Sequence, residues 1–482
     1  MIGQPLSAAN GLLTLPALLV GGLIGMALLT YLLRNWETLT ALMTALFTGA
    51  LGLWFWQLDL NAPIFSLPLA GQVLDITAPL TRLGFTFQLQ PSALPILMTA
   101  CLMASAAFLL TAAISQGRSF APFTLVLLAG YVAIALMTSG PLAPLFLTPL
   151  FLVGLNAGAV FVLQAGRLTN PSGPLRMLLP PILAFPLFLL AYWYIEQIPL
   201  NPQDNSAQLT AARLFTIGLL ILLMPAPFHS AQPATAYSAP PVVTALVTLL
   251  YQLALLHLLF RVISPYPFVA QIGSFELWMT WAGLATTVWG GIAAAGSSHP
   301  GRLWGYAALH DWGLILMILA APGLRSWPLA LFLFGLRIVS MLTAAAGLAT
   351  LEQHIGGMSA TRIQGAGNRL PWNSAAFLLG GLGLTGFPLS AGFTGHWTAL
   401  QIIAENDWRP AAIVLFASVG AIWGFVRLTR ILFGPLENRF LLRERMVSVA
   451  LALCMLLLSI SLALAPQLLD GPIRTVWAAF SG

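Results

Sequence analysis

Residues 227–252 read PFHSAQPATAYSAPPVVTALVTLLYQ, and this stretch decides how the chain must fold. Prolines and small polar residues crowd its first half, while its second half is apolar and uncharged. Proline removes a backbone donor and clashes with the preceding turn, so a helix that enters this stretch must break. A broken helix is tolerated inside a membrane only where protein or water satisfies the freed backbone groups. The stretch therefore predicts an interrupted membrane helix that is buried in a helical bundle.

A second interruption is expected in residues 372–404, which contain FLLGGLGLTGFPLSAGFTGHW. Each interrupted segment is the fourth helix of a five-helix block, the first over residues 119–262 and the second over 276–433. Two broken helices at matching places in two blocks are typical of inverted-repeat transporters. The sequence thus predicts a transport-related fold with two inverted five-helix repeats.

Composition defines the class of protein. Hydrophobic residues make up 59% of the 482 residues and charged residues only 7%, and the mean hydropathy is +0.90. Apolar runs of about 20 residues are long enough to cross the hydrocarbon core as helices, whereas barrel strands are shorter and alternate in polarity. We therefore expect an all-α polytopic membrane protein in contact with lipid. The formal charge of +6 reflects arginines in loops, so no nucleic-acid partner is expected.

The apolar runs predict about fourteen transmembrane helices, of which the seventh and the twelfth are discontinuous. They lie near residues 11–33, 38–57, 94–115, 119–139, 141–165, 174–195, 213–228, 240–262, 276–297, 302–321, 326–349, 372–404, 410–433 and 447–467. Residues 1–115 contain the first three helices, and residues 434–482 contain the last helix and a tail. Residues 58–93 form an external loop, whose alternating polarity predicts a small hairpin.

An even number of spans places both termini on one side of the membrane. Loops on the opposite side hold twelve of the nineteen basic residues, and the terminal side holds six. By the positive-inside rule, both termini face away from the cytoplasm. Both cysteines, Cys101 and Cys454, lie in apolar runs, so we expect small core residues and no metal site.

Four segments resemble the antiporter-like membrane subunits of respiratory complex I and the related Mrp-type cation/proton antiporter subunits. They are residues 227–252, quoted above, GRLWGYAALHDWGLIL (301–316), TGFPLSAGFTGHW (385–397) and FLVGLNAGAVFVL (151–163). The resemblance extends over about residues 94–435, and the chain length favours the subunit N type of NADH-quinone oxidoreductase. It implies a non-catalytic membrane subunit of a proton-translocating complex of the respiratory chain.

The resemblance also implies where a proton relay would lie. That family moves protons along buried glutamates and lysines, since a neighbouring charge can flip the protonation of a buried lysine. This chain has no lysine, because all nineteen basic residues are arginine. The family's glutamate position falls on Asn156, two lysine positions fall on Leu222 and Gln252, and the last falls on His396. An exchange of lysine for arginine does not explain these residues, so we expect the usual relay to be largely lost.

Other ionisable residues could rebuild a proton path. His310 and Asp311 lie on the tenth predicted helix, and Asp311 follows Arg302, at the helix start, by about 13 Å. A carboxylate at that depth costs about 2.5–3.5 kcal/mol unless it is paired. Arg337, at a similar depth on the next helix, is the expected partner. Asp311 is then either a switchable proton carrier or one half of a fixed ion pair that locks helix packing.

Three further histidines are candidates, because histidine titrates near neutral pH. His396 replaces a relay lysine with another titratable group. His257 follows Gln252 by about 7.5 Å along the helix, and it is either a relay group or a neutral histidine bonded to a carbonyl. His229, at the first break, lies on a hydrated path or caps exposed carbonyls.

Three functions remain open from the sequence. The first is a sealed, non-pumping spacer, the second a proton-translocating subunit with a rebuilt histidine/aspartate path, and the third a stand-alone cation/proton antiporter that uses Asp311. The resemblance implies other membrane-arm subunits as partners and the bacterial inner membrane as location. It also implies no cofactor in this chain, with flavin, iron–sulfur clusters and quinone chemistry on partner subunits.

Overall fold

The computed structural model describes residues 14–58, 64–67, 72–82, 85–139, 144–163, 171–200, 205–263, 266–272, 274–320, 326–435 and 444–481. Parts of the first and last predicted segments, residues 1–13 and 436–443, lie outside these ranges. The described chain is mostly helical, and ten of its helices are long and apolar enough to cross a membrane. This confirms an integral, mainly α-helical membrane protein. The larger number of about fourteen spans stays a prediction.

The helices follow one another along the whole chain. They are α1 (Leu15–Leu32), α2 (Glu37–Gln57), α3 (Leu94–Ala113), α4 (Phe120–Leu136), α5 (Pro144–Leu163), α6 (Ser172–Arg176), α7 (Leu179–Gln197), α8 (Asn205–Leu223), α9 (Ala231–Ser238), α10 (Pro241–Ile263), α11 (Phe268–Ile272), α12 (Phe275–Gly296), α13 (Pro300–Ala320), α14 (Ser326–Ile355), α15 (Ala360–Ile363), α16 (Pro371–Gly383), α17 (Phe393–Asn406), α18 (Trp408–Leu432), α19 (Met446–Leu464) and α20 (Asp470–Ser481). Short 3₁₀ turns are η1 (Pro91–Ala93), η2 (Ile198–Leu200), η3 (Phe228–Ser230), η4 (Ala366–Asn368) and η5 (Pro466–Leu469).

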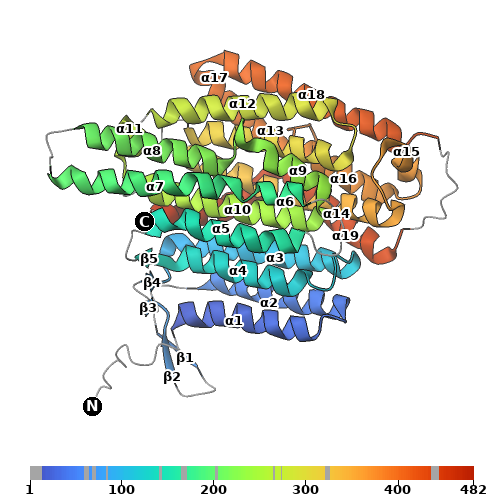
Figure 1. The fold of residues 1–482 in the computed structure, drawn as a ribbon. Helices are drawn as coiled ribbons and strands as arrows, with labels where there is room; N and C mark the ends of the chain where they lie inside the picture. The colour runs from blue at the N-terminus through green and yellow to red at the C-terminus, as the bar shows by residue number, and fades with distance from the viewer. Residues whose placement is uncertain are drawn as a thin grey trace.

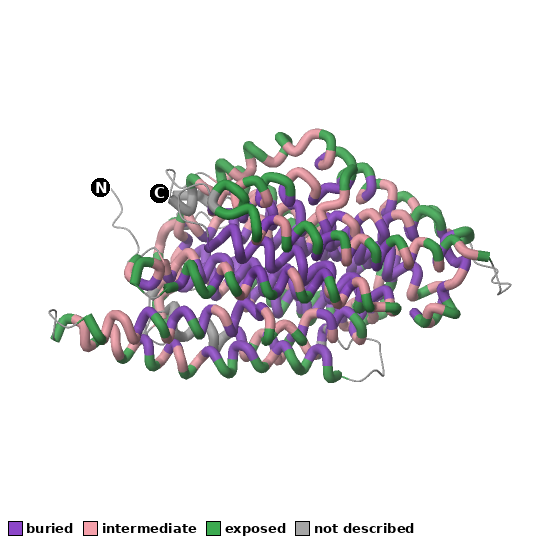
Figure 2. The backbone as a smooth tube through the Cα atoms, turned by 90° about the horizontal axis from the view of Figure 1, so that it is seen from above, coloured by how far each residue is buried: buried purple, intermediate pink, exposed green. Residues whose placement is uncertain are grey.

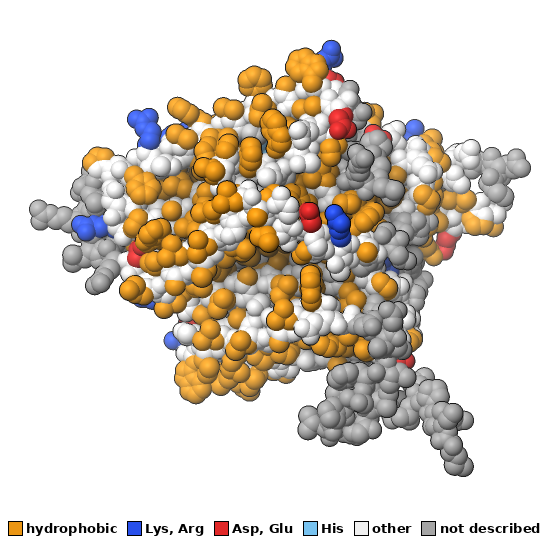
Figure 3. Space-filling view, turned by 180° about the vertical axis from the view of Figure 1, so that it is seen from behind, with side chains coloured by type: hydrophobic (Ala, Val, Ile, Leu, Met, Phe, Trp, Pro, Cys, Tyr) orange, Lys and Arg blue, Asp and Glu red, His pale blue; other side chains and the backbone are white. Residues whose placement is uncertain are grey.

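The long helices lie side by side in one stack, with α1 at one edge and α17 and α18 at the opposite edge (Figure 1). Buried residues gather along the middle of the stack, and exposed residues lie around it (Figure 2). Helices α10 and α13 are buried almost throughout, as expected of helices that are apolar on every side. On the face shown in Figure 3, hydrophobic side chains dominate and charged side chains are few, as a lipid-facing surface requires.

Five short strands lie at the end of the stack where the chain also ends (Figure 1). Strands β1 (Ile64–Leu67) and β2 (Gln72–Asp75) form one antiparallel pair. Strands β3 (Leu80–Arg82), β4 (Phe85–Phe87) and β5 (Met137–Ser139) form a second small sheet. The hairpin predicted in the external loop is therefore present, and β5 ties it to the end of α4.

Prolines explain several helix starts. Proline stands in the first turn of α1, α3, α7 and α16, and α10 and α13 also begin with proline. The first helical residues need no intrahelical donor, and proline already has the required φ. The start of α18 is different, because Asp407 accepts a hydrogen bond from the backbone N–H of Arg409 at 2.9 Å, which is a side-chain cap.

The structure corrects several boundaries. The helix predicted over 119–139 ends at Leu136, because the next three residues pair with β4. The segment predicted over 174–195 divides into α6 and α7, and the segment predicted over 213–228 is helical over α8 instead. Helix α20 was not predicted, and its Val476 and Trp477 pack against the main core. Cys101 is buried, but Cys454 is exposed, so the expectation of a core residue is wrong for Cys454.

Candidate functional site

The first interrupted helix is formed by α8 and α9, and its free backbone groups are satisfied by neutral side chains. The carbonyl of Leu222 accepts a hydrogen bond from the Tyr251 hydroxyl at 2.9 Å. The carbonyl of Leu223 accepts one from the indole N–H of Trp312 at 2.8 Å. These carbonyls have lost their helical donors, and a buried carbonyl without a donor costs free energy. Helices α10 and α13 therefore close the break with uncharged groups.

The second interrupted helix is formed by α16 and α17, and glycine permits its turn. Gly386 has φ +70° and Leu389 has φ +66°, which is a conformation that glycine adopts at little cost and leucine at a higher one. A Cβ on Gly392 would lie within 1.9 Å of the Gly383 carbonyl oxygen, so the two ends approach backbone to backbone. The turn directs His396, in the first turn of α17, toward α13.

A buried ionic cluster joins α13, α14 and α17. Asp311 accepts from Arg337 Nη1 at 2.6 Å through Oδ2 and from His396 Nε2 at 2.8 Å through Oδ1. All three side chains are at most 5% exposed. The ion pair of Asp311 and Arg337 that the sequence predicts is therefore present, and it includes His396 as a third member. Removing one partner of such a pair leaves an uncompensated charge in an apolar surrounding.

Arg337 is held in place by further contacts. Its Nε donates to Gln252 Oε1 at 2.9 Å, and its Nη1 also donates to the Ala308 carbonyl at 2.7 Å. The guanidinium lies 5.6 Å from the ring centre of Trp312, within the range of a cation–π interaction. Gln252, one of the expected relay positions, thus serves as an acceptor for the Arg337 guanidinium.

His310 points to other helices than its neighbour Asp311 does. Its Nδ1 lies 2.9 Å from the Thr287 carbonyl on α12, and its Nε2 lies 2.9 Å from the Ser418 hydroxyl on α18. The rings of His310 and His396 are 6.0 Å apart. The sequence alone did not single out Thr287 or Ser418, because isolated hydroxyl residues on apolar helices are common. Only the small residues of α12, which allow close packing, could have indicated them.

The remaining relay positions are buried and neutral. Asn156 on α5 donates to the Met177 carbonyl at 2.7 Å, and Leu222 is fully buried on α8. A cavity of about 20 Å³ lies between Gln252 and Met177, whose carbonyl accepts the hydrogen bond of Asn156. It has room for about one water. Its lining residues are Met177, Leu223, Met224, Ala231, Gln232, Thr248, Tyr251, Gln252 and Trp312.

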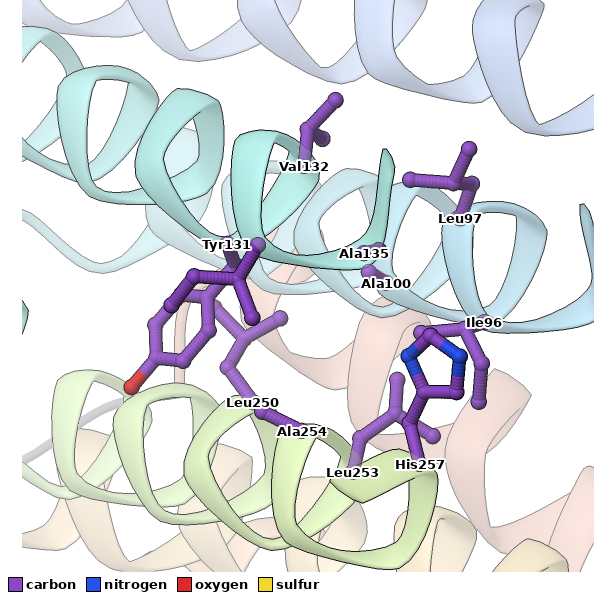
Figure 4. A pocket seen from close by; sticks show the side chains of 11 residues that line it. Ile96, Leu97, Ala100, Tyr131, Val132, Ala135, Leu250, Leu253, Ala254 and His257 are labelled. Atoms are coloured by element: carbon purple, nitrogen blue, oxygen red, sulfur yellow. The ribbon is translucent and has the colours of Figure 1, made fainter. Parts of the chain in front are cut away.

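His229 and His257 lie elsewhere. His229 is half-buried at the first break, where its ring centre lies 5.7 Å from that of Trp289 on α12. His257 lines a separate, mainly apolar cavity between α3, α4 and α10, with Tyr131 at the other end (Figure 4). No residue of the ionic cluster lines that cavity. The structure therefore brings together His310, Asp311, Arg337 and His396, but not His229 or His257.

The structure contains two interrupted membrane helices, each with buried polar groups at its break, an arrangement that is common in transport-type membrane folds. The family profile described as NADH:quinone oxidoreductase/Mrp antiporter, transmembrane region, matches residues 184–422, which contain both interruptions and the ionic cluster. The chain belongs to this family of antiporter-like membrane subunits.

Individual relatives agree with this assignment. The chain is 27% identical over 238 residues to NADH-quinone oxidoreductase subunit N of Parafrankia sp., over 48% of this chain and 44% of the relative. It thus spans about half the length of the curated relatives it matches. Its fold is similar to a chain of the archaeal membrane-bound sulfane sulfur reductase, with TM-score 0.75, 16% identity and coverage of 96% and 97%. It is also similar to a chain of respiratory complex I from Thermus thermophilus, with TM-score 0.70, 16% identity and coverage of 95% and 99%.

Proposed function

We propose that this chain is an antiporter-like membrane-arm subunit of a complex-I-type quinone oxidoreductase and acts there as a sealed spacer. The observation that carries the proposal is the neutral centre of the first block. By the resemblance described above, Asn156, Leu222 and Gln252 would stand where the related subunits have titratable groups, and none of the three can take up or release a proton near neutral pH. A hopping proton needs such groups or a continuous file of water, and the cavity beside Gln252 has room for about one water.

The spacer role agrees with the second block as well. A guanidinium stays charged at any physiological pH, and Arg337 uses two of its nitrogens on Asp311, Gln252 and Ala308. Such an ion pair fixes the packing of α13 on α14. A subunit with this centre keeps its neighbours in line without itself opening a path across the membrane.

A second candidate function is proton translocation through His310, Asp311 and His396. The observation in its favour is that these three groups lie together at the second interrupted helix. A stand-alone cation/proton antiporter is less well supported. Asp311 would have to bind the cation, but its two oxygens already accept from Arg337 and His396.

The architecture of the related subunits comes with the proposal. We infer about fourteen spans, with residues 119–262 and 276–433 as inverted repeats and both termini on the non-cytoplasmic side of a bacterial inner membrane. The partners would be other membrane-arm subunits. Flavin, iron–sulfur clusters and quinone chemistry would belong to subunits outside this chain.

Purification tests membership of the complex, and proton counting tests the spacer. Co-purification with iron–sulfur clusters and quinone reductase activity supports the complex, whereas a lone chain that exchanges cations for protons in liposomes contradicts it. In vesicles that contain the intact complex, the spacer predicts an unchanged proton-to-electron ratio in His396→Gln. A lower ratio at unchanged electron transfer would replace the spacer with the second candidate. His354→Gln, at the far end of α14, serves as the control.

A further inference from the structure

His310 lies where α12, α13 and α18 cross at unusually short distances. A Cβ on Gly290 would lie 2.5 Å from the backbone nitrogen of His310, and a Cβ on Gly291 would lie 2.2 Å from the carbonyl oxygen of Ala417. Because both glycines lack a side chain, α12 can touch α13 and α18 at once. One imidazole therefore reaches both neighbouring helices.

The hydrogen bonds of His310 require a hydrogen on Nδ1 and allow Nε2 to be either protonated or unprotonated. The Thr287 carbonyl can only accept, so Nδ1 carries a hydrogen. The Ser418 hydroxyl contacts Nε2 and also lies 3.1 Å from the Val414 carbonyl. It has a single hydrogen. If that hydrogen points to Nε2, His310 is neutral; if it points to Val414, Nε2 must donate and His310 is an imidazolium. Rotation of one hydroxyl accommodates either state without moving a heavy atom.

His396 also accommodates two states. Asp311 Oδ1 is a carboxylate oxygen and accepts, so Nε2 of His396 carries a hydrogen in the neutral and in the charged ring. A second proton would reside on Nδ1. Since Asp311 and Arg337 compensate each other, the charge of the cluster is set by the state of His396.

The two rings are too close to be charged together. Their centres are 6.0 Å apart, and at an effective dielectric constant of about 20 the repulsion weakens binding of a second proton about a hundredfold. We propose that His310 and His396 form one proton-binding site that holds a single proton on either ring but not on both, with Thr287 and Ser418 as positioning residues. This inference deepens the second candidate function, because it specifies which groups would hold the transferred proton.

Apart from Asp311 and Arg337, the nearest ionisable side chain on the described parts of the helices around the pair is that of Tyr306, about one turn before His310. On each helix, the remaining groups lie about 12 Å or more along the axis from the residue that is level with the histidine pair. They are Arg302 on α13, Glu276 on α12, Glu352 and His354 on α14, Glu405 on α17, Tyr237 on α9, and Arg409, Arg427 and Arg430 on α18.

Solid-state NMR of the full chain in lipid, labelled with ¹⁵N-histidine, tests the shared site directly. The chain has six histidines, so each signal can be assigned by one His→Gln substitution. The repulsion acts on the ring that binds its proton second. Replacing the ring that binds first, by His396→Gln, which keeps a donor to Asp311, or by His310→Gln, should therefore raise the proton affinity of the remaining ring about a hundredfold. The opposite variant should leave the affinity of the first-binding ring nearly unchanged. His354→Gln should leave both rings unchanged. Changes of less than threefold in both variants would show independent sites and overturn the proposal.

Ser418 provides the test of positioning. Ser418→Ala removes the acceptor for charged His310 and should lower its proton affinity at least tenfold, while Ser418→Thr keeps the hydroxyl and should restore it. An unchanged affinity in Ser418→Ala would contradict the role of the hydroxyl. These measurements need no electron transfer, so a result against the shared site is distinguishable from a result against membership of the complex.

Discussion

The two interrupted helices solve the same physical problem in different ways. At the α8–α9 break, neutral donors from Tyr251 and Trp312 satisfy the free carbonyls. At the α16–α17 break, His396 enters a buried ionic cluster with Asp311 and Arg337. A break in a membrane helix therefore does not by itself indicate a proton site. The ionisable groups that line the break decide whether protons can bind there.

The two breaks also differ in whether the side chains that close them can change charge. At the first break, the hydrogen bonds of Tyr251 and Trp312 to the two carbonyls involve no group that changes charge near neutral pH. The second break is closed by charged and ionisable groups, among them the imidazole of His396. The side chains that close the first break are therefore uncharged, whereas those at the second break include a histidine, an aspartate and an arginine. Three pairs of substitutions test this contrast, from the largest expected effect to the smallest, and a fourth prediction concerns pH.

Removal of the buried carboxylate should have the largest effect. Asp311→Asn leaves the guanidinium of Arg337 buried without its counter-ion, so the free energy of unfolding in detergent micelles should fall by about 3–5 kcal/mol. The matched change in the first block, Asn156→Ala, removes one neutral hydrogen bond and should cost about 1–3 kcal/mol. Equal losses in the two variants would remove the contrast between the blocks.

The next largest loss of stability is expected when lysine replaces a buried neutral residue near the first break. Leu222→Lys places an ammonium group among neutral residues and should lower stability by about 2.5–3.5 kcal/mol. His396→Lys places the same group beside Asp311, where a carboxylate compensates it, and should cost clearly less. Unfolding of the two purified variants under identical conditions measures the difference. A smaller loss of stability in Leu222→Lys than in His396→Lys would mean that a counter-charge lies near position 222.

The hydrogen bond that Tyr251 donates at the first break should contribute less to the free energy of unfolding. Tyr251→Phe removes only the hydroxyl that donates to the Leu222 carbonyl, so stability should fall by about 1 kcal/mol. Tyr194→Phe on α7 removes a hydroxyl from a partly exposed tyrosine and serves as the control. If the two variants unfold alike, the hydroxyl of Tyr251 does not stabilise the break.

The fourth prediction concerns pH and a histidine outside the membrane spans. Burial, with a contribution from the charge of Arg302, lowers the pKa of His299 to about 4. A histidine with a lowered folded-state pKa favours folding in its neutral form, so this stability is present above about pH 6.5 and is lost as the pH falls toward 4. The unfolding temperature should therefore decrease over this window, and less so in His299→Gln. Identical pH profiles of the two proteins would exclude this contribution.

Much of the fold could be predicted from the sequence, because its signals are local. Hydrophobic runs indicated the spans, prolines and glycines indicated both breaks, and strand-like alternation indicated the external hairpin. Helix ends were harder, since pairing of β4 with residues after Leu136 is a tertiary effect. Depth along neighbouring helices was enough to pair Asp311 with Arg337. The addition of His396 to that pair depends on the backbone turn at Gly386, which no local pattern specifies.

The roles of His310 and its partners could not be predicted for the same reason. Adjacent residues on a helix point in directions about 100° apart, so His310 and Asp311 contact different helices. Which helices these are depends on the close packing at Gly290 and Gly291. His257 shows the same limit of a sequence argument, since its distance from Gln252 along the helix did not reveal that it faces another cavity.

An experimental density map of the intact complex, at a resolution that shows ordered water, tests the central claim most directly. The neutral first block predicts no continuous file of water that joins Asn156, Leu222 and Gln252, and at most an isolated molecule in the cavity beside Gln252. A connected file of water from one membrane face through these positions to the ionic cluster would contradict the account.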